Sequence, residues 1–172
     1  VSIHRLRWPF VRGRQGAPRN RGRGLAVGLV LVVVALSAAG PQVGIGVDAG
    51  AETTRITVHP DDGAPAQVQV QIADTPGEQF TGLSRTDSLG PDEGMVFVYS
   101  RTDERNFVMR DMAFPLDIVF VDGNRTITAI HHAAADADGT FTGDARWVIE
   151  VNRGWTTTHG VEVGDQVSGL PR

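Results

Sequence analysis

The chain has 172 residues, a length that fits one domain with a shorter additional segment. It contains no cysteine, which excludes a disulfide framework, a thiolate metal site and a cysteine nucleophile. Its net charge of −4 is unevenly distributed: residues 1–24 carry seven arginines and no acid, whereas residues 25–172 carry nine arginines and 20 acids. Because affinity for nucleic acid comes from neutralising phosphates, we expect no nucleic-acid partner for the acidic part.

An uncharged run, GLAVGLVLVVVALSAAG, occupies residues 24–40, and a weaker extension reaches residue 47. A membrane-spanning helix needs roughly 20 apolar residues, so this run predicts an N-terminal hydrophobic helix that anchors the protein in the cell membrane. The arginine-rich flank places the leader in the cytoplasm and the rest of the chain outside. The alternative is a signal peptide cleaved near residues 35–38, which would yield a secreted protein.

The remaining sequence is dominated by short alternating runs of β-branched residues bounded by Gly, Pro and Asp, a pattern typical of strands. The segment AQVQVQIA alternates strictly, as expected of a strand with one face in water. The expected strands are residues 54–59, 66–73, 94–100, 106–110, 115–122, 125–132, 146–152 and 160–167. Asp122-Gly123-Asn124 is expected to form a tight hairpin turn, and residues 153–155 another turn.

One helix is predicted to begin after Thr75. Thr75 is a suitable N-cap, Pro76 a suitable first helical residue, and Glu78 completes a capping box. We expect this helix to run to about Arg85 and to be held by packing, since its glycines lower its intrinsic propensity.

The predicted fold is therefore all-β: a sandwich or jelly-roll-like fold, or a partly open barrel, of about eight strands with one short packed helix. We divide the chain into a basic cytoplasmic leader (1–24), a transmembrane anchor or signal segment (25–47), a linker with the first strand (48–65) and the β domain (66–170).

Asp117 is the first candidate site residue, because it lies in the apolar strand PLDIVFVD. An ionised carboxylate in such a strand is costly unless it is paired or hydrogen-bonded. The predicted partners are Arg110, Arg105, Arg85 or backbone N–H groups. Two interpretations stay open: a structural carboxylate buried in an arginine pair, and a carboxylate that faces a cleft.

Glu150 poses the same question in the strand RWVIEVN. It fits a solvent-facing position, and it could also combine with Asp117 into the pair of carboxyl groups that acid–base catalysis uses.

The sequence gives little support for a metal site or a cofactor-binding site. Adjacent His131 and His132 point to opposite faces of a strand, so they cannot share one metal in regular β geometry. The loop 136–144 faintly resembles a calcium loop, but it lacks the third acid before the glycine and has Trp147 in place of the Glu at position twelve. Neither a phosphate-binding loop nor a dinucleotide fingerprint occurs. We therefore predict no metal and no cofactor.

Four segments together resemble the domain-of-unknown-function family 192: GEQFTGLSRTDSLGPDEGMVFVY, NFVMRDMAFPLDIVFVDGN, WVIEVNRGW and GVEVGDQV. The resemblance covers about residues 66–168 and implies an all-β domain of the sandwich or jelly-roll type, with no established activity. Arg85, Met109, Asp117 and Glu150 fall on the family pattern. The sequence departs from the family's Phe-Trp-Met-Lys-Asn-Thr segment, where it reads FVMRDM and has Val108 in place of the Trp.

Three hypotheses follow for function. The first is a membrane-anchored, outward-facing module that binds a small molecule, peptide or partner protein. Its site would lie around Arg85, Met109, Arg110, Asp117 and Glu150. The second is a carboxylate-dependent hydrolase that uses Asp117 and Glu150. The third is a structural module in which Asp117 forms a buried arginine pair.

Overall fold

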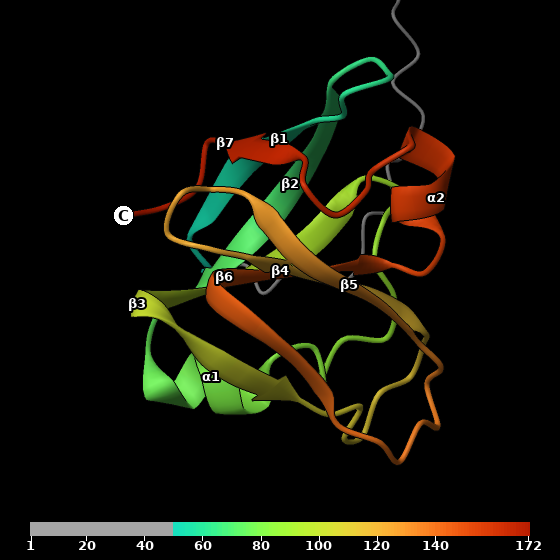
Figure 1. Ribbon diagram of the computed structural model, residues 1–172. Helices are drawn as coiled ribbons and strands as arrows, with labels where there is room; N and C mark the ends of the chain where they lie inside the picture. The colour runs from blue at the N-terminus through green and yellow to red at the C-terminus, as the bar shows by residue number, and fades with distance from the viewer. Residues whose placement is uncertain (1–49) are drawn as a thin grey trace, which may run out of the picture. The chain divides into compact units, whose positions relative to one another are not determined.

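The computed structural model describes residues 50–172, which form a curled sheet of seven strands with two short helices (Figure 1). The predicted leader (1–24), the predicted anchor or signal segment (25–47) and the first residues of the linker lie outside this range. Within residues 50–172, no helix combines the length and the apolar character needed to span a membrane. The elements are β1 (Thr53–His59), β2 (Ala66–Ala73), α1 (Pro76–Thr81), β3 (Glu93–Phe107), β4 (Leu116–Val121), β5 (Ile127–Ala133), β6 (Phe141–Asn152), α2 (Trp155–His159) and β7 (Gln166–Ser168).

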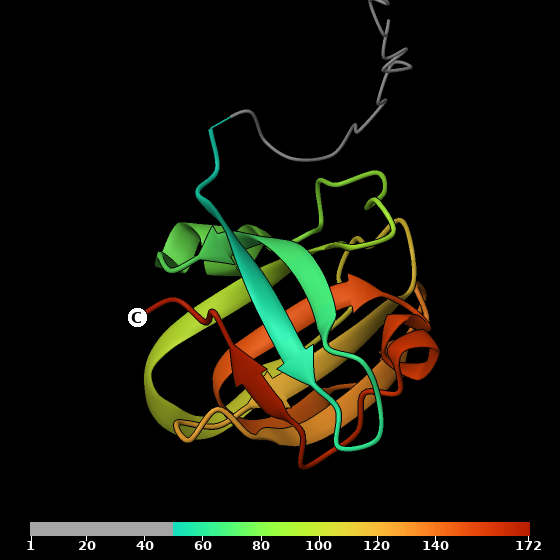
Figure 2. The same cartoon turned by 90° about the horizontal axis from the view of Figure 1, so that it is seen from above.

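The strands follow the order β5-β4-β6-β3-β2-β1-β7 across the sheet. All neighbours are antiparallel except β2 and β3, which run parallel and are joined by the crossover that contains α1. The sheet curls until β7 approaches the start of β5, where Val167 N–H donates to the Arg125 carbonyl at 2.9 Å (Figure 2). The predicted mostly-β fold with a short helix is thus confirmed, in the form of a curled half-barrel.

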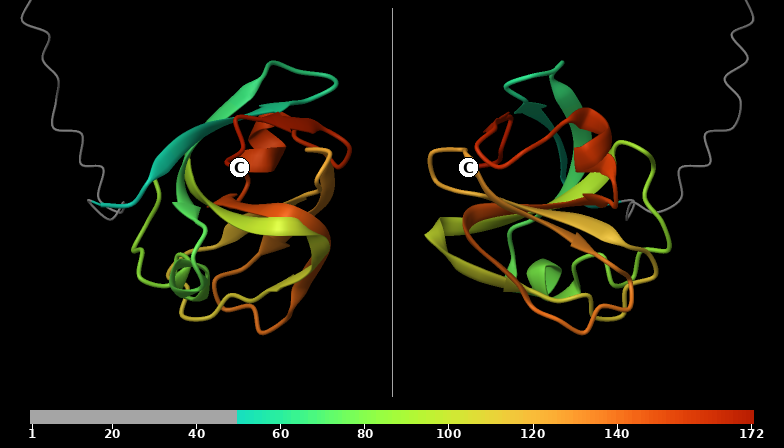
Figure 3. Two further views of the ribbon diagram at one scale, coloured as in Figure 1. Left: turned by 90° about the vertical axis from the view of Figure 1, so that its left-hand side faces the viewer. Right: turned by 45° about the vertical axis from the view of Figure 1, so that its right-hand side comes forward.

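Both faces of the sheet are covered, so the domain has two hydrophobic cores. On one side, β1, β2, β7 and α2 close over the centre of the sheet, and on the other side lie α1 and the loops (Figure 3). We call these the upper and the lower core. The upper core contains Ile56, Val58, Val68, Val70, Val96, Val119, Val121, Trp147, Ile149, Val151, Trp155 and Val167. The lower core contains Leu83, Met95, Phe97, Met109, Leu116, Ile118, Phe120 and Val148.

The alternation of the central strands assigns each side chain to one core. On β4, Ile118 and Phe120 belong to the lower core and Val119 to the upper core; on β6, Val148 belongs to the lower core and Ile149 to the upper core. Because successive side chains of a strand point to opposite faces, Asp117 faces the upper core and Glu150 the lower core.

The predicted helix is confirmed, but it is shorter than expected. The Thr75 hydroxyl accepts from Glu78 N–H, and the Glu78 carboxylate accepts from Thr75 N–H at 3.0 Å, so both halves of the capping box form. The helix ends at Thr81, not near Arg85, because Gly82 adopts a positive φ of 50°.

Four other predictions need correction. Segments 94–100 and 106–110 belong largely to one strand, β3, so the described residues form seven strands instead of eight. The pairing of β3 with β6 shifts register between Val98 and Asp103. The helix α2 follows Gly154, where only a turn was expected. Most of residues 160–167 lie outside β7. In the predicted hairpin turn, the residue with positive φ is Arg125 (67°), at the third loop position.

Candidate functional site

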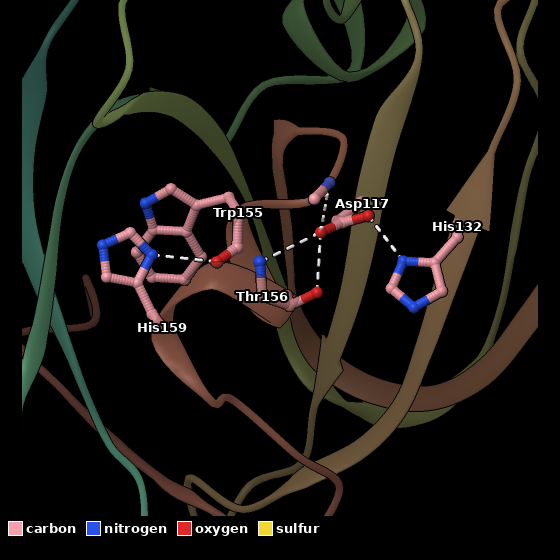
Figure 4. A network of polar contacts seen from close by, with 6 residues as sticks. Asp117, His132, Trp155, Thr156 and His159 are labelled. Atoms are coloured by element: carbon pink, nitrogen blue, oxygen red, sulfur yellow. Dashed lines mark hydrogen bonds and ion pairs between the residues drawn. The ribbon is translucent and has the colours of Figure 1, made fainter. Parts of the chain in front are cut away.

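The Asp117 carboxylate is fully buried and accepts four hydrogen bonds (Figure 4). One oxygen accepts from Thr156 Oγ1 at 2.6 Å, Thr156 N–H at 3.0 Å and Gly154 N–H at 3.1 Å. The other contacts His132 Nδ1 at 2.6 Å. Burial alone would raise the pKa of Asp117, but the hydrogen bonds from Thr156, His132 and Gly154 together hold the pKa below its usual value. Because the carboxylate is ionised and can only accept, Nδ1 of His132 is the donor.

None of the predicted arginine partners contacts this carboxylate. Within residues 50–172, Asp117 forms no ion pair with Arg85, Arg105 or Arg110. The predicted backbone N–H partners are present and belong to the segment where α2 begins. Asp117 therefore joins β4 to β5 and to α2, and α2 is held further by Trp155 Nε1–H, which donates to Asp92 at 3.1 Å.

Glu150 occupies the opposite face of the sheet, where it lies beneath an open cavity of ≈ 190 Å³. Its side chain comes from the last residues of β6, between Met95 of β3 and Ile118 of β4. The residue is only 6% exposed, yet among residues 50–172 no hydrogen bond or ion pair reaches its carboxyl group. Burial raises the pKa of Glu150 to about 8, so the carboxyl holds a proton at neutral pH.

The walls of this cavity, which we call the Glu150 pocket, combine aromatic and polar side chains from α1 and the turn after it, from β3 and the loop after it, and from β6. Its lining residues are Gln79, Phe80, Thr81, Gly82, Leu83, Ser84, Phe97, Tyr99, Asn106, Phe107, Val108, Arg110, Met112 and Glu150. The rings of Phe97 and Phe107 meet edge to face at 4.9 Å between centroids. Phe80 and Val108 are 71% and 55% exposed, so large apolar side chains stand uncovered in the lining.

Two arginines lie near the pocket, and each is held by other groups. The Arg110 guanidinium lies 4.1 Å from the centroid of the Phe80 ring and donates to the Phe80 carbonyl. Arg105 lies 4.0 Å from the centroid of the Tyr99 ring and donates to the carbonyls of Ala145 and Arg101. Burial raises the pKa of the Tyr99 hydroxyl. The charge of Arg105 lowers this pKa, and the charge of Glu150 raises it further.

The structure brings together two of the five predicted site residues, Arg110 and Glu150. Met109 is buried in the lower core beside the pocket without lining it, and Arg85 is exposed beyond α1. Asp117 and Glu150 lie on neighbouring strands, but they face opposite cores, so the predicted carboxyl pair does not form.

The aromatic side chains of the pocket and the role of His132 were not predicted from the sequence. Phe80 could have been noticed from the sequence, because it is a large apolar side chain on a short predicted helix. His132 shares a face with Asp117 once β4 and β5 pair, but the pairing of Asp117 with His132 depends on the bulge near Val121.

Comparison with known proteins assigns the chain to a family. The model of the family DUF192, described as "Uncharacterized ACR", matches residues 57–169. A search of curated proteins finds no match. A protein from Sinorhizobium meliloti 1021, described as a "putative transcription regulator", is 25% identical, with a TM-score of 0.67 over 72% of this chain and 98% of that chain.

A second solved structure, a protein of unknown function from Novosphingobium aromaticivorans, is 30% identical, with a TM-score of 0.66 over 70% of this chain and 87% of that chain. The curled half-barrel is therefore shared with both solved structures. Since the family model covers most of the described domain, the chain belongs to the DUF192 family.

Proposed function

We propose that the β domain is a binding module for a small, ring-sized organic molecule, which it takes up in the Glu150 pocket. The observation that carries the proposal is the Glu150 carboxyl group, which is almost fully buried and lacks a hydrogen-bond partner among the described residues. The buried side-chain atoms without a partner in residues 50–172 are Gln71 Nε2 and Arg146 Nε, so the Glu150 oxygens differ from these in being open to the cavity, where a ligand can bond to them. A ligand that bonds to Glu150 would provide the missing partner.

The size and surface of the pocket agree with this proposal. A volume of ≈ 190 Å³ lies below that of drug-sized sites and is comparable with the engineered cavity of about 150 Å³ that binds benzene. Two of the three most exposed large apolar side chains in the described part of the chain, Phe80 and Val108, line this pocket. Exposed apolar groups gathered at one place favour a binding site.

The other hypotheses receive less support. A hydrolase that uses Asp117 and Glu150 would need both carboxyl groups beside one substrate, whereas a sheet separates them. The "transcription regulator" description belongs to the Sinorhizobium meliloti protein, and the acidic charge of residues 25–172 argues against a nucleic-acid partner here. Anchoring in the cell membrane with the β domain outside remains our proposal and rests on residues 1–47.

The proposal can be tested by screening the full chain against a library of single-ring compounds with saturation-transfer NMR. Compounds that bind in the pocket should lose their signal with Phe80→Ala, because Phe80 forms an exposed part of its wall. The matched control is Val163→Ala, which removes a similarly exposed apolar side chain (60%) that does not line the pocket. A screen without hits, or hits that are indifferent to Phe80→Ala, would overturn the proposal.

A further inference from the structure

We infer that the natural occupant of the Glu150 pocket is a small organic amine, bound as a cation with its ammonium group on the Glu150 carboxylate. This inference rests on the proposed function and names the class of ligand. It is carried by the charges and the aromatic groups that surround the pocket.

The titratable side chains that line the pocket are Glu150 on β6, Tyr99 on β3 and Arg110 in the loop after β3. Arg110 is the cation among them, and its guanidinium is held by the Phe80 ring and carbonyl. Arg105 is likewise held on Tyr99 and on two carbonyls. Among residues 50–172 no ion pair joins Glu150 to either arginine, so a cationic ligand would supply the counter-charge when Glu150 ionises.

The rings of Phe80 and Tyr99 each already hold a guanidinium at about van der Waals distance, at 4.1 and 4.0 Å from the ring centroids. Such contacts show that these ring faces attract positive charge, as expected from the electron density above aromatic rings. Phe97 and Phe107 extend this aromatic surface toward Glu150. An ammonium group in the pocket would thus meet a carboxylate below and aromatic groups around it.

In the empty pocket at neutral pH, Glu150 is protonated, because burial raises its pKa to about 8. When a protonated amine, R–NH₃⁺, binds, the Glu150 proton leaves for solvent and the carboxylate pairs with the ammonium group. Binding should therefore release close to one proton at pH 6–7 and fewer above pH 8. The affinity should rise about tenfold per pH unit below the pKa of Glu150, because the fraction that is ionised rises by that factor.

The experiment uses three probes with one shape and different charge: benzylamine, benzyl alcohol and benzoate. Each is titrated into the full chain by isothermal calorimetry at pH 6, 7 and 8. Two buffers with different enthalpies of ionisation are used, so that proton release can be counted. We expect benzylamine to bind with proton release and with affinity that increases with pH. Benzyl alcohol and benzoate should bind at least tenfold more weakly at pH 8.

Glu150→Gln separates the amine from other ligands. The glutamine keeps the size and can donate a hydrogen bond, but it cannot carry charge, so the affinity for benzylamine should fall about ten- to one-hundredfold. Phe80→Ala provides a second variant that leaves the buried core intact and should also weaken benzylamine binding. A near-UV circular dichroism spectrum shows whether Glu150→Gln has folded.

The outcomes distinguish the two proposals. If benzyl alcohol or benzoate binds as well as benzylamine, and Glu150→Gln retains that binding, the pocket is a binding site but the amine inference is wrong. Absence of benzylamine binding also overturns the inference. The proposed function fails separately, when no single-ring compound in the library shows binding that depends on Phe80.

Discussion

Asp117 shows how a single buried carboxylate can fix three elements. Its four hydrogen bonds connect β4 with β5 through His132 and with the start of α2 through Thr156 and Gly154. An isolated buried charge would be strongly destabilising, so these bonds are needed to keep the ionised form in place. Since they lower the pKa of Asp117, their stabilisation is present above the normal aspartate pKa and is lost as the pH falls below it.

We predict that Asp117→Asn lowers the free energy of unfolding by about 3–5 kcal/mol, because the amide cannot accept all four bonds and its NH₂ group would face donors. Urea denaturation at pH 7 measures the change. The matched control is Asp138→Asn in the exposed loop before β6, for which a change within about 0.5 kcal/mol is expected. Equal stability of the two variants would show that the Asp117 network is unimportant for the fold.

Glu150 should make stability depend on pH in the opposite direction. The pKa of its carboxyl is about 8 in the folded protein and near 4.5 in the unfolded chain. Between these values the folded state retains a proton that the unfolded state releases, so stability falls as the pH rises. The total decline from this group is on the order of 3–5 kcal/mol, and it levels off above pH 8.

Glu150→Gln tests this prediction, because it removes the titrating group and keeps the shape. The free energy of unfolding, measured with urea at pH 5.5, 7 and 8.5, should decline less with pH in the variant than in the parent protein. Other groups contribute equally to both proteins, so the difference isolates Glu150. Parallel pH profiles would mean that Glu150 is ionised and hydrated in the folded state.

At the scale of elements, the contact between β3 and β6 depends on a glycine. A Cβ atom at Gly94 would lie 2.4 Å from the Glu150 carbonyl oxygen and 3.0 Å from Val151 Cγ1. Gly94→Ala should therefore lower the free energy of unfolding by about 1–3 kcal/mol, because either the strands must separate or the backbone of Glu150 must shift. Thermal unfolding followed by circular dichroism measures this effect.

Gly139→Ala is the matched control for Gly94→Ala, since no atom lies within 4 Å of the added methyl group. It should change stability by less than about 0.5 kcal/mol. If both alanine variants unfold at the same temperature as the parent protein, the close approach of β3 and β6 at Gly94 is easily relieved.

Elements with strong local signals could be predicted from the sequence. The alternation in residues 66–73 matches β2, and the capping box of Thr75 and Glu78 correctly marks the start of α1. α2 could not be predicted, because its WTTTH segment is rich in poor helix formers and depends on distant contacts with Asp117 and Asp92. Residues 160–165 alternate like a strand, yet Val163 is 60% exposed and the pattern does not reflect a buried face.

The candidate site was harder to predict from the sequence than the strands. The alternation in β6 showed that Glu150 shares a face with Val148, but it did not show whether that face is exposed to solvent or packed against other elements. The covering groups come from α1 and from both halves of β3, segments that approach one another only in the folded sheet. The sequence showed that Asp117 is unusual, but it did not identify its partners. His132 becomes a partner through the register of β4 and β5, and Thr156 belongs to α2, which was not predicted.

At the scale of the whole molecule, the C-terminal segment completes the upper core. Val167 and Leu170 are buried there, and the Pro171 carbonyl accepts from Trp147 Nε1–H at 3.0 Å. Asp165 is also buried and accepts from Glu162 N–H and Asp61 N–H. These contacts join the C-terminal segment to β6 and to the loop after β1.

Removal of residues 165–172 should therefore abolish cooperative unfolding or lower the midpoint temperature by more than 10 °C, since two buried apolar side chains and several hydrogen bonds are lost. The near-UV circular dichroism signal and a thermal melt measure the result. Removal of Arg172 alone, an exposed residue, serves as the control. An unchanged melt for the longer truncation would mean that the half-barrel is stable without β7.

The pairing of β1 with β7 has a consequence for how such a domain can be combined with other sequences. Thr57 lies opposite Ser168 in an antiparallel pair, so the chain enters the half-barrel and leaves it at the same end of these two strands. Domains whose ends lie together tolerate circular permutation and insertion into a host protein. A short linker could join Arg172 to the start of β1, with new ends opened in the exposed loop around Gly139. The half-barrel could thus be carried as an insert within a surface loop of another protein, with both cores and the Glu150 pocket preserved.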